Sequence, residues 1–412
     1  MARNAAWRRF GLLIGASIAT APLMLQPLPA AAASAGALYT IGSSSFLMQV
    51  DPGTGTLTPV VDLSSPGVGF GLFDNFGNLA TDSRAQRLFV QRTISDFTVD
   101  PPTTEIQILT ISPGAATFAA GPDLTQPLDG IAFDSANSLF GIIQCCPGQL
   151  VRVDLTTGSE TLVANLVGDA FSPMAINPST HTLYVVSISH STFPSPTRLL
   201  SVDTVTGAVS TSPVLNRGVV GLVFDPSPGT LFGATFCCFD SFIVKIAPST
   251  GTETTITEIT GTELESNSAT IDPATHTIYV LNSISDPELG SHSYVMSIND
   301  QTGASTTGLA TTEFIGSFAF LPAPVSITAD SIKADVKSAL ASGAINNDGV
   351  ASSLLAELNA ASAAQSRGQC ATAAVLYTSF INDVNAQSGK HIAAATAAQL
   401  VSEAQFLIAN CP

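Results

Sequence analysis

Two pairs of adjacent cysteines are the residues whose type and spacing give the most specific chemical signal in this chain. Cys145-Cys146 and Cys237-Cys238 each follow a Leu-Phe-Gly tripeptide after three intervening residues. Adjacent cysteines can close a disulfide ring if the peptide between them distorts to reach disulfide geometry. The alternatives are a cross-link between the two turns and a redox or metal role, although thiolate metal sites usually use Cys-x-x-Cys spacing, which is absent. We predict a disulfide within each pair.

Four of the five histidines fall into two kinds of position. His181 and His276 occupy the same Thr-His-Thr tripeptide in two similar segments, so we attribute them to duplication rather than to catalysis. His190 and His292 lie in two longer insertions, where they are candidates for binding a ligand or metal at the mouth of a central pore. Neither has a Glu or Asp partner directly beside it in the sequence, which weakens that assignment.

The sequence lacks the common catalytic and cofactor motifs. It has no Gly-x-Ser-x-Gly, no His-Glu-x-x-His, no phosphate loop and no Asp-x-Asp-x-Asp-Gly calcium loop. Four polar residues that follow apolar strands could be mistaken for the axial metal ligands of lactonase-type rings: Asp134, Asn177, Asp225 and Asp272. By position they belong to turns at the opposite end of the strand from the usual ligand face, so we assign them to turn capping. We predict no catalytic residue, no cofactor and no metal ligand.

Two alternating repeats must position these residues. The first places Thr-Gly before a strand, in residues 50–60, 153–163, 202–212, 246–256 and 298–308. The second is a strand, a polar turn and an aromatic-bearing strand, in residues 79–90, 131–141, 175–185, 222–233 and 269–280. This period and strand composition are typical of a β-propeller. The sixth copy is divided between residues 316–322 and 37–51, which predicts an all-β six-bladed ring over residues 36–322, closed by terminal strands that share one blade.

The repeats match better in alternate blades than in neighbouring blades. The two Cys-Cys segments are offset by 92 residues, and the two Thr-His-Thr segments by 95. Blades with Cys-Cys alternate with blades that carry a longer insertion, at residues 93–105, 189–197 and 283–293. We therefore expect pseudo-three-fold symmetry, with a pair of blades as the repeating unit.

The N-terminus carries the pattern of an export signal. Three arginines, at positions 3, 8 and 9, precede an apolar stretch that is too short and too broken to span a membrane. Small residues around Ala33 offer a cleavage site, so residues 1–33 are predicted to be a signal peptide and the protein to be secreted or held at the cell surface.

Cleavage of this signal lowers the net charge from −17 to −20, because three arginines are removed and no acidic residue is. A chain this acidic should bind neither nucleic acid nor anionic membranes, and no later stretch is long and apolar enough to form a membrane span.

The hydrophobic pattern changes from strand to helix period after residue 322. Residues 323–326 are a short linker, and residues 327–412 are predicted to form a small bundle of four Ala-rich helices, in which Thr328 and Asp348 cap the first two. Cys370 begins the third helix and Cys411 follows the fourth, so both lie at the same end of an antiparallel hairpin. We predict a third disulfide, between Cys370 and Cys411.

This helical segment resembles a known family. The run Phe-Ile-Asn-Asp-Val-Asn-Ala-Gln-Ser-Gly-Lys-His-Ile at residues 380–392, preceded by Ser-Leu-Leu-Ala-Glu-Leu-Asn-Ala-Ala and Gly-Gln-Cys, is similar to the FIMAH domain. The resemblance covers residues 327–411, about a fifth of the chain. It implies a bacterial, exported, modular protein and implies no catalytic residues. The propeller resembles six-bladed rings in general and no single family.

The longer insertions form the surface that is best placed for function, because variable loops on a rigid scaffold commonly carry binding sites. Candidate contact residues on it are Phe97, His190, Phe193 and His292. We expect non-catalytic binding of an extracellular protein or glycan. A hydrolase or lyase with a site at the pore mouth, and a structural cell-surface or matrix component, are the rival interpretations. Acidic residues or histidines gathered around the axis would favour the enzyme, whereas an exposed aromatic loop surface would favour binding.

Overall fold

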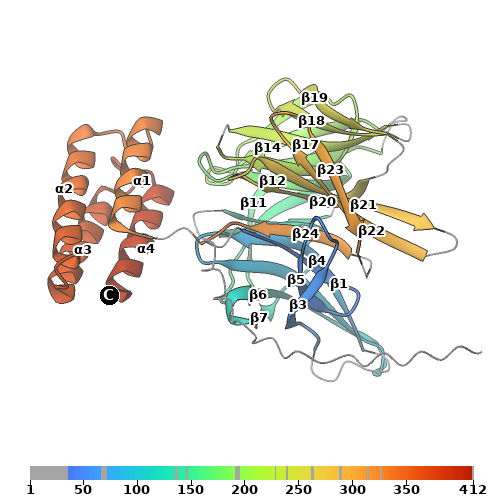
Figure 1. Ribbon diagram of the computed structural model, residues 1–412, viewed down its shortest axis with the longest axis horizontal. Coiled ribbons are helices and arrows are strands. Elements are labelled where there is room, and N and C mark those ends of the chain that lie inside the picture. The colour runs from blue at the N-terminus through green and yellow to red at the C-terminus, as the bar shows by residue number, and fades with distance from the viewer. Residues whose placement is uncertain are drawn as a thin grey trace, which may run out of the picture. The chain divides into compact units, whose positions relative to one another are not determined.

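The protein forms a ring of β-sheets followed by a set of helices (Figure 1). The computed structural model describes residues 36–65, 72–134, 138–144, 147–190, 195–227, 229–237, 240–260, 264–286, 290–311, 313, 315–324 and 327–410. In these residues, strands β1 to β24 form six four-stranded antiparallel sheets, and helices α1 to α4 follow. None of these helices is long and apolar enough to cross a membrane. The predicted six-bladed propeller with C-terminal helices is confirmed.

Blade 1 closes the ring. It joins the last strand to the first three, in the order β24 (Ile315–Leu321), β1 (Ala37–Gly42), β2 (Phe46–Val50) and β3 (Leu57–Asp62). Strands β24 and β1 run antiparallel, with Phe320 opposite Leu38 and Leu321 opposite Ala37. The terminal strands therefore share one sheet, as the divided repeat predicts.

Each of the other five blades uses four consecutive strands. Blade 2 contains β4 (Leu72–Asp82), β5 (Arg87–Asp96), β6 (Thr103–Ser112) and β7 (Thr117–Asp123), with the 3-10 helix η1 (Pro113–Ala115) before β7. Blade 3 contains β8 (Ile131–Asp134), β9 (Ser138–Ile143), β10 (Gly148–Val153) and β11 (Glu160–Leu166). Blade 4 contains β12 (Ala170–Asn177), β13 (Thr182–Ile188), β14 (Thr197–Asp203) and β15 (Val209–Val214). Blade 5 contains β16 (Gly218–Asp225), β17 (Thr230–Cys237), β18 (Asp240–Ala247) and β19 (Thr252–Ile259). Blade 6 contains β20 (Leu264–Asp272), β21 (Thr277–Asp286), β22 (Gly290–Asn299) and β23 (Ser305–Ala310).

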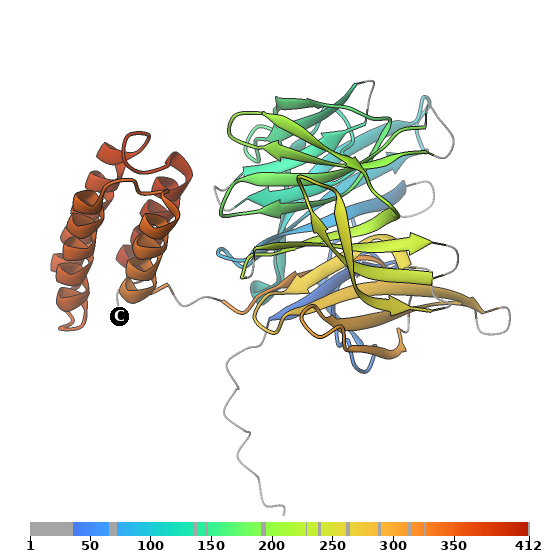
Figure 2. The ribbon, with the colours of Figure 1, turned by 90° about the horizontal axis from the view of Figure 1, so that it is seen from above.

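The core lies between neighbouring blades, which pack face to face (Figure 2). Phe140 and Leu150 of blade 3, for example, pack in one cluster with Leu183 and Leu200 of blade 4. A sheet that is covered on both faces buries successive side chains, which is why the second strands β5 and β13 each contain five consecutive buried residues rather than an alternation of buried and exposed ones.

The Thr-Gly repeats form the turns between the third and fourth strands. In blade 4, the Asp203 carboxylate accepts hydrogen bonds from the backbone N–H groups of Val205 and Thr206, at 2.9 Å each. Gly207 then adopts a left-handed backbone with φ of +73° and approaches the Val163 carbonyl of blade 3. A side chain here would strain the backbone and collide with the neighbouring blade. The glycine of the repeat therefore serves blade-to-blade packing as well as the turn.

Three stacked aromatic pairs bear out the expected symmetry. The ring centroids lie 4.9 Å apart for Phe89 and Phe133, 6.0 Å for Tyr184 and Phe224, and 5.9 Å for Tyr279 and Phe320. These pairs join blade 2 to 3, blade 4 to 5 and blade 6 to 1. The same contact thus recurs at alternate interfaces, so a pair of blades is the structural repeat.

The four helices are α1 (Ala329–Ser342), α2 (Asp348–Gln365), α3 (Cys370–Gln387) and α4 (Ala394–Ala409). Their apolar faces meet in one core that contains the fully buried rings of Tyr377 and Phe380. Thr328 caps α1 as predicted, since its side chain accepts from the Ser331 backbone N–H. The predicted cap of α2 was wrong by one residue: Asn347 is the N-cap, and its side-chain oxygen accepts from the Val350 N–H.

Candidate functional site

An exposed aromatic pair lies in the region predicted to be the ligand face. Phe97, which directly follows β5, is 59 % exposed, and Phe73 of β4 is 61 % exposed. The two rings meet edge to face, with centroids 5.8 Å apart and planes at 74°. Val99, in the same β5–β6 connection, is also exposed. Sequence reasoning selected Phe97 and missed Phe73, whose position on the first strand of the blade gave no signal of exposure.

The other predicted contact residues are described only in part. The backbone N–H of His190 donates to Asp169 Oδ2 at 2.7 Å, and the residue is exposed. Phe193 lies outside the described residues, as does the side chain of His292, whose backbone pairs with Ile284 at the start of β22. The proposed common face of all four residues therefore stays a prediction.

Two of the six cysteines, Cys237 and Cys370, are among the described residues. Cys237 is the last residue of β17, and its backbone pairs with Asp240. Cys145, Cys146 and Cys238 lie outside the described residues. Cys370, the first residue of α3, is disulfide-bonded, but Cys411 is outside the described part of the chain. All three pairings stay predictions.

Most side chains that line the axis of the ring are apolar. A cavity of about 180 Å³ lies among the innermost strands, and its described lining contains aliphatic and aromatic residues with two threonines, Thr81 and Thr270, and neither acid nor histidine. A second cavity, of about 220 Å³, lies where the first strands end; there the Asp82 carboxylate is 2.6 Å from the Arg87 guanidinium. The gathering of acids or histidines around the axis that would favour an enzyme is not found among the described residues.

The two Thr-His-Thr histidines join neighbouring blades. His181 Nδ1 of blade 4 lies 2.7 Å from Asp134 Oδ2 of blade 3, and His276 Nδ1 of blade 6 lies 2.9 Å from Asp225 Oδ2 of blade 5. The third copy of this turn, in blade 2, holds Gln86. Its side-chain amide donates to the backbone carbonyl of Pro322, which directly follows β24 of blade 1, at 3.0 Å. All three turn residues have φ between 52° and 53°. We call each of these contacts a turn latch; the three latches lie at the interfaces that lack the aromatic stacks.

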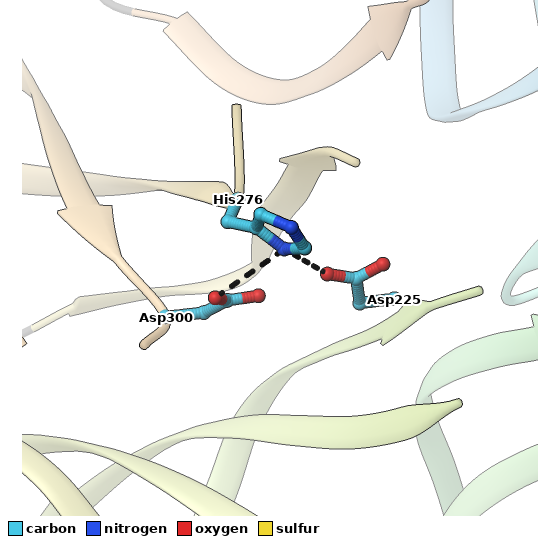
Figure 3. A group of neighbouring side chains, drawn as sticks. All are labelled: Asp225, His276 and Asp300. Carbon is cyan, nitrogen blue, oxygen red and sulfur yellow. Dashed lines mark hydrogen bonds and ion pairs between the residues drawn. The ribbon is translucent and has the colours of Figure 1, made fainter. Parts of the chain in front are cut away.

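One of the turn latches has an additional carboxylate (Figure 3). Asp300 Oδ1 lies 3.7 Å from His276 Nδ1, so the imidazole nitrogen faces both Asp300 and Asp225. The ligand atoms of these three residues lie within 4.8 Å of one another. Asp300 is only 4 % exposed, and neither of its carboxylate oxygens has a hydrogen-bond partner among the described residues. A buried carboxylate without partners is costly, so this arrangement calls for an explanation.

Burial and neighbouring groups raise the pKa values of Asp300, His276 and His181. Burial, followed by the nearby Asp225 carboxylate, raises the pKa of Asp300 to about 6. The hydrogen bond to Asp225 raises the pKa of His276, and the bond to Asp134 likewise raises the pKa of His181. Asp225 also keeps the role predicted from the sequence, because its Oδ1 accepts from the Ser227 backbone N–H at 2.8 Å. It caps its turn and reaches the next blade at the same time.

The related latch in blades 3 and 4 differs at the equivalent position. Thr204 there occupies the place of Asp300, since the backbone N–H of Thr204 donates to the His181 carbonyl and that of Asp300 to the His276 carbonyl, each at 2.9 Å. The Thr204 hydroxyl also donates to the His181 carbonyl at 2.9 Å. Aligning Val-Asp-Thr at residues 202–204 with Ile-Asn-Asp at residues 298–300 could have revealed the difference from the sequence.

Comparison with known proteins identifies the helical segment and the fold of the ring. The model of the FIMAH domain family matches residues 329–409. A chain of the crystal structure of a nidogen/laminin complex is similar with a TM-score of 0.51 and 10 % identity, over 70 % of this chain and 100 % of that one. The crystal structure of TolB from Acinetobacter baumannii is similar with a TM-score of 0.50 and 12 % identity, over 70 % of this chain and 67 % of that one. No curated protein matches the chain. At such low identity the two structures support the propeller fold alone.

Proposed function

We propose that this propeller with a FIMAH domain is an exported protein that binds, without catalysis, a partner outside the cell or at its surface. The observation that carries the proposal is the exposed pair in blade 2 formed by Phe73 of β4 and Phe97, which directly follows β5. Large aromatic side chains in contact with water are the kind of residue that anchors interfaces, because their burial on binding releases much apolar surface.

A protein fits this surface better than a glycan does. Sugar rings stack on open, flat aromatic faces and also need polar groups for their hydroxyls. The edge-to-face geometry turns the edge of one phenylalanine onto the other, and phenylalanine has no polar atom to offer. Val99 adds aliphatic surface nearby.

The rival functions have weaker support. A hydrolase or lyase at the pore mouth needs convergent polar side chains, and the described side chains that line the axial cavity are apolar apart from two threonines. A structural surface component does not require an exposed aromatic pair on one hairpin. Export rests on the N-terminal sequence pattern and on the FIMAH domain.

The binding surface can be tested with cell-surface and secreted material of the source bacterium as the probe. We expect the Phe73→Ser/Phe97→Ser variant to bind at least about tenfold more weakly than the unchanged chain. The matched control is Leu162→Ser/Val205→Ser, which removes two exposed apolar side chains elsewhere on the ring; its binding should be unchanged.

Treatment of the probe separates the two kinds of partner. Protease should abolish binding, and periodate, which cleaves sugar diols, should not. Binding that survives protease and is lost with periodate would identify a glycan instead. Equal loss in both variants, or in neither, would contradict the assignment to the phenylalanine pair.

A further inference from the structure

We propose that Asp225, His276 and Asp300 bind one divalent transition-metal ion that joins blade 5 to blade 6. The site is independent of the phenylalanine surface of blade 2. Its donors are two carboxylate oxygens and one imidazole nitrogen, all provided by residues at the ends of strands or in the turns that follow them (Figure 3).

The geometry suits such an ion. Zinc lies about 2.0–2.2 Å from histidine nitrogen and carboxylate oxygen ligands, so its ligand atoms can be separated by up to about 4 Å. The three groups here already lie within 4.8 Å of one another. The largest of these separations exceeds that limit by less than about 1 Å, a difference that rotation of the side chains can remove.

The unpartnered Asp300 carboxylate is the second, independent indication. It is 4 % exposed, faces His276 Nδ1, and has no hydrogen bond to either oxygen among the described residues. Asp225 Oδ2 lies on the other side of the same nitrogen. Two buried carboxylates carry two negative charges, of which a protonated His276 would balance at most one, whereas a divalent cation balances both.

The related latch shows what the same turn looks like without this group. His181 and Asp134 form the histidine–carboxylate contact there, and Thr204 stands in place of Asp300. Thr204 satisfies its own hydroxyl by donating to the His181 carbonyl. A turn that serves only packing therefore does not need the third carboxylate, which leaves Asp300 to be explained by a ligand.

The donor set selects the class of metal. Imidazole favours zinc and other first-row transition ions, whereas calcium and magnesium prefer sites made entirely of oxygen ligands. Three protein ligands leave room for a water molecule, and the His276 side chain is 26 % exposed, so solvent can reach the site from its side. We assign the ion a structural role, because the two ligand-bearing strand ends belong to different blades.

The experiment uses the full mature chain, stripped with EDTA and titrated with Zn²⁺ alone. We expect one tightly bound ion per chain by calorimetry and by metal analysis after gel filtration. At a hundredfold excess over Kd, the thermal midpoint of the ring should rise by roughly 5 °C. Co²⁺ in place of Zn²⁺ should show visible absorption bands, and Ca²⁺ or Mg²⁺ should not compete.

Three variants make the test specific. Asp300→Thr copies the related latch and should weaken Zn²⁺ binding at least about tenfold. Asp300→Asn keeps the shape of the side chain and should do the same if the threonine variant fails to fold. Asp134→Asn alters the other latch and should bind Zn²⁺ like the unchanged chain.

Three results would contradict the proposed metal site. Retention of Zn²⁺ affinity in both Asp300 variants would overturn the proposal, as would a Zn²⁺ response that Asp134→Asn abolishes. A full chain that binds no Zn²⁺ at millimolar concentration would overturn it too.

Discussion

The two histidine latches of the ring are copies of one turn with different third residues. In blades 3 and 4, His181 meets Asp134 and stands beside a hydrogen-bonded Thr204. In blades 5 and 6, His276 meets Asp225 and faces an unpartnered Asp300. The main-chain geometry is the same in both, down to the N–H of the third residue donating to the histidine carbonyl. A duplicated packing contact can thus become a candidate ligand site through one side chain. That side chain, Asp300, comes from the Thr-Gly repeat, whereas His276 comes from the strand–turn–strand repeat.

The largest loss of stability should come from substituting the glycine of the Thr-Gly turn that follows Thr204 or Asp300. We expect the loss to be equal in the two latches. Gly207→Ala and Gly303→Ala each place a side chain on a left-handed backbone, with φ of +73° and +72°. At Gly303 the new Cβ would lie 2.6 Å from the Ile256 carbonyl of blade 5, and at Gly207 it would collide with the Val163 carbonyl. We expect each variant to lower the free energy of unfolding by about 2–4 kcal/mol in calorimetry or denaturant titration.

Gly229→Ala is the matched control for this prediction. Its backbone is also left-handed, with φ of +66°, but nothing lies within 4 Å of the new Cβ. It should cost only the backbone term, about 1–2 kcal/mol. If Gly207→Ala and Gly303→Ala cost no more than Gly229→Ala, close packing against the neighbouring blade is not what fixes these glycines.

The ring could be predicted from the sequence because its signals are local. Thr-Gly turns, polar turns and aromatic strands recur within each blade, and the leftover strand at residues 316–322 supplies the one missing piece. The Asp300 cluster could not be predicted in the same way. Asp225 and His276 are 51 residues apart and meet only when two blades pack, so the partner of each turn residue depends on tertiary structure. Phe73 was missed for a similar reason, because its exposure and its contact with Phe97 depend on how the chain packs in three dimensions rather than on a local sequence pattern.

Moving the carboxylate to the other latch gives the next largest effect. Thr204→Asp should create the Asp300 arrangement beside His181 and Asp134. The hydroxyl bond to the His181 carbonyl is lost, and a buried carboxylate is added. In EDTA we expect a loss of about 1–3 kcal/mol in unfolding free energy, the usual cost of a buried polar group without partners. Zn²⁺ should recover part of this loss and raise the bound metal from one ion per chain to two.

Asp300→Thr provides the reverse change. It should stabilise the chain in EDTA and remove the response to Zn²⁺. If Thr204→Asp gains no Zn²⁺ response while remaining folded, a third carboxylate is not sufficient to turn a latch into a metal site, and the difference between the two latches then lies elsewhere.

The smallest effect is the pH dependence of the latch without the third carboxylate, which a substitution at His181 isolates from the other latch. The hydrogen bond to Asp134 raises the pKa of His181 above its ordinary 6.5, against the opposing effect of burial, and Asp203 adds a weaker attraction. Since the folded-state pKa exceeds the unfolded value, the latch contributes its full stability below about pH 6.5 and loses it as the pH rises through the folded-state pKa.

His181→Gln replaces the imidazole by the neutral amide that the third latch uses at Gln86. The unchanged chain should therefore exceed the variant in stability by about 1 kcal/mol near pH 5.5, and by less near pH 8.5, because a charge-assisted hydrogen bond becomes a neutral one. Thermal midpoints of both chains across this range in EDTA, with an NMR titration of the His181 ring protons, measure the effect. A stability difference that is flat or grows with pH would show that His181 holds its blade as a neutral ring, with no contribution from the charge on Asp134.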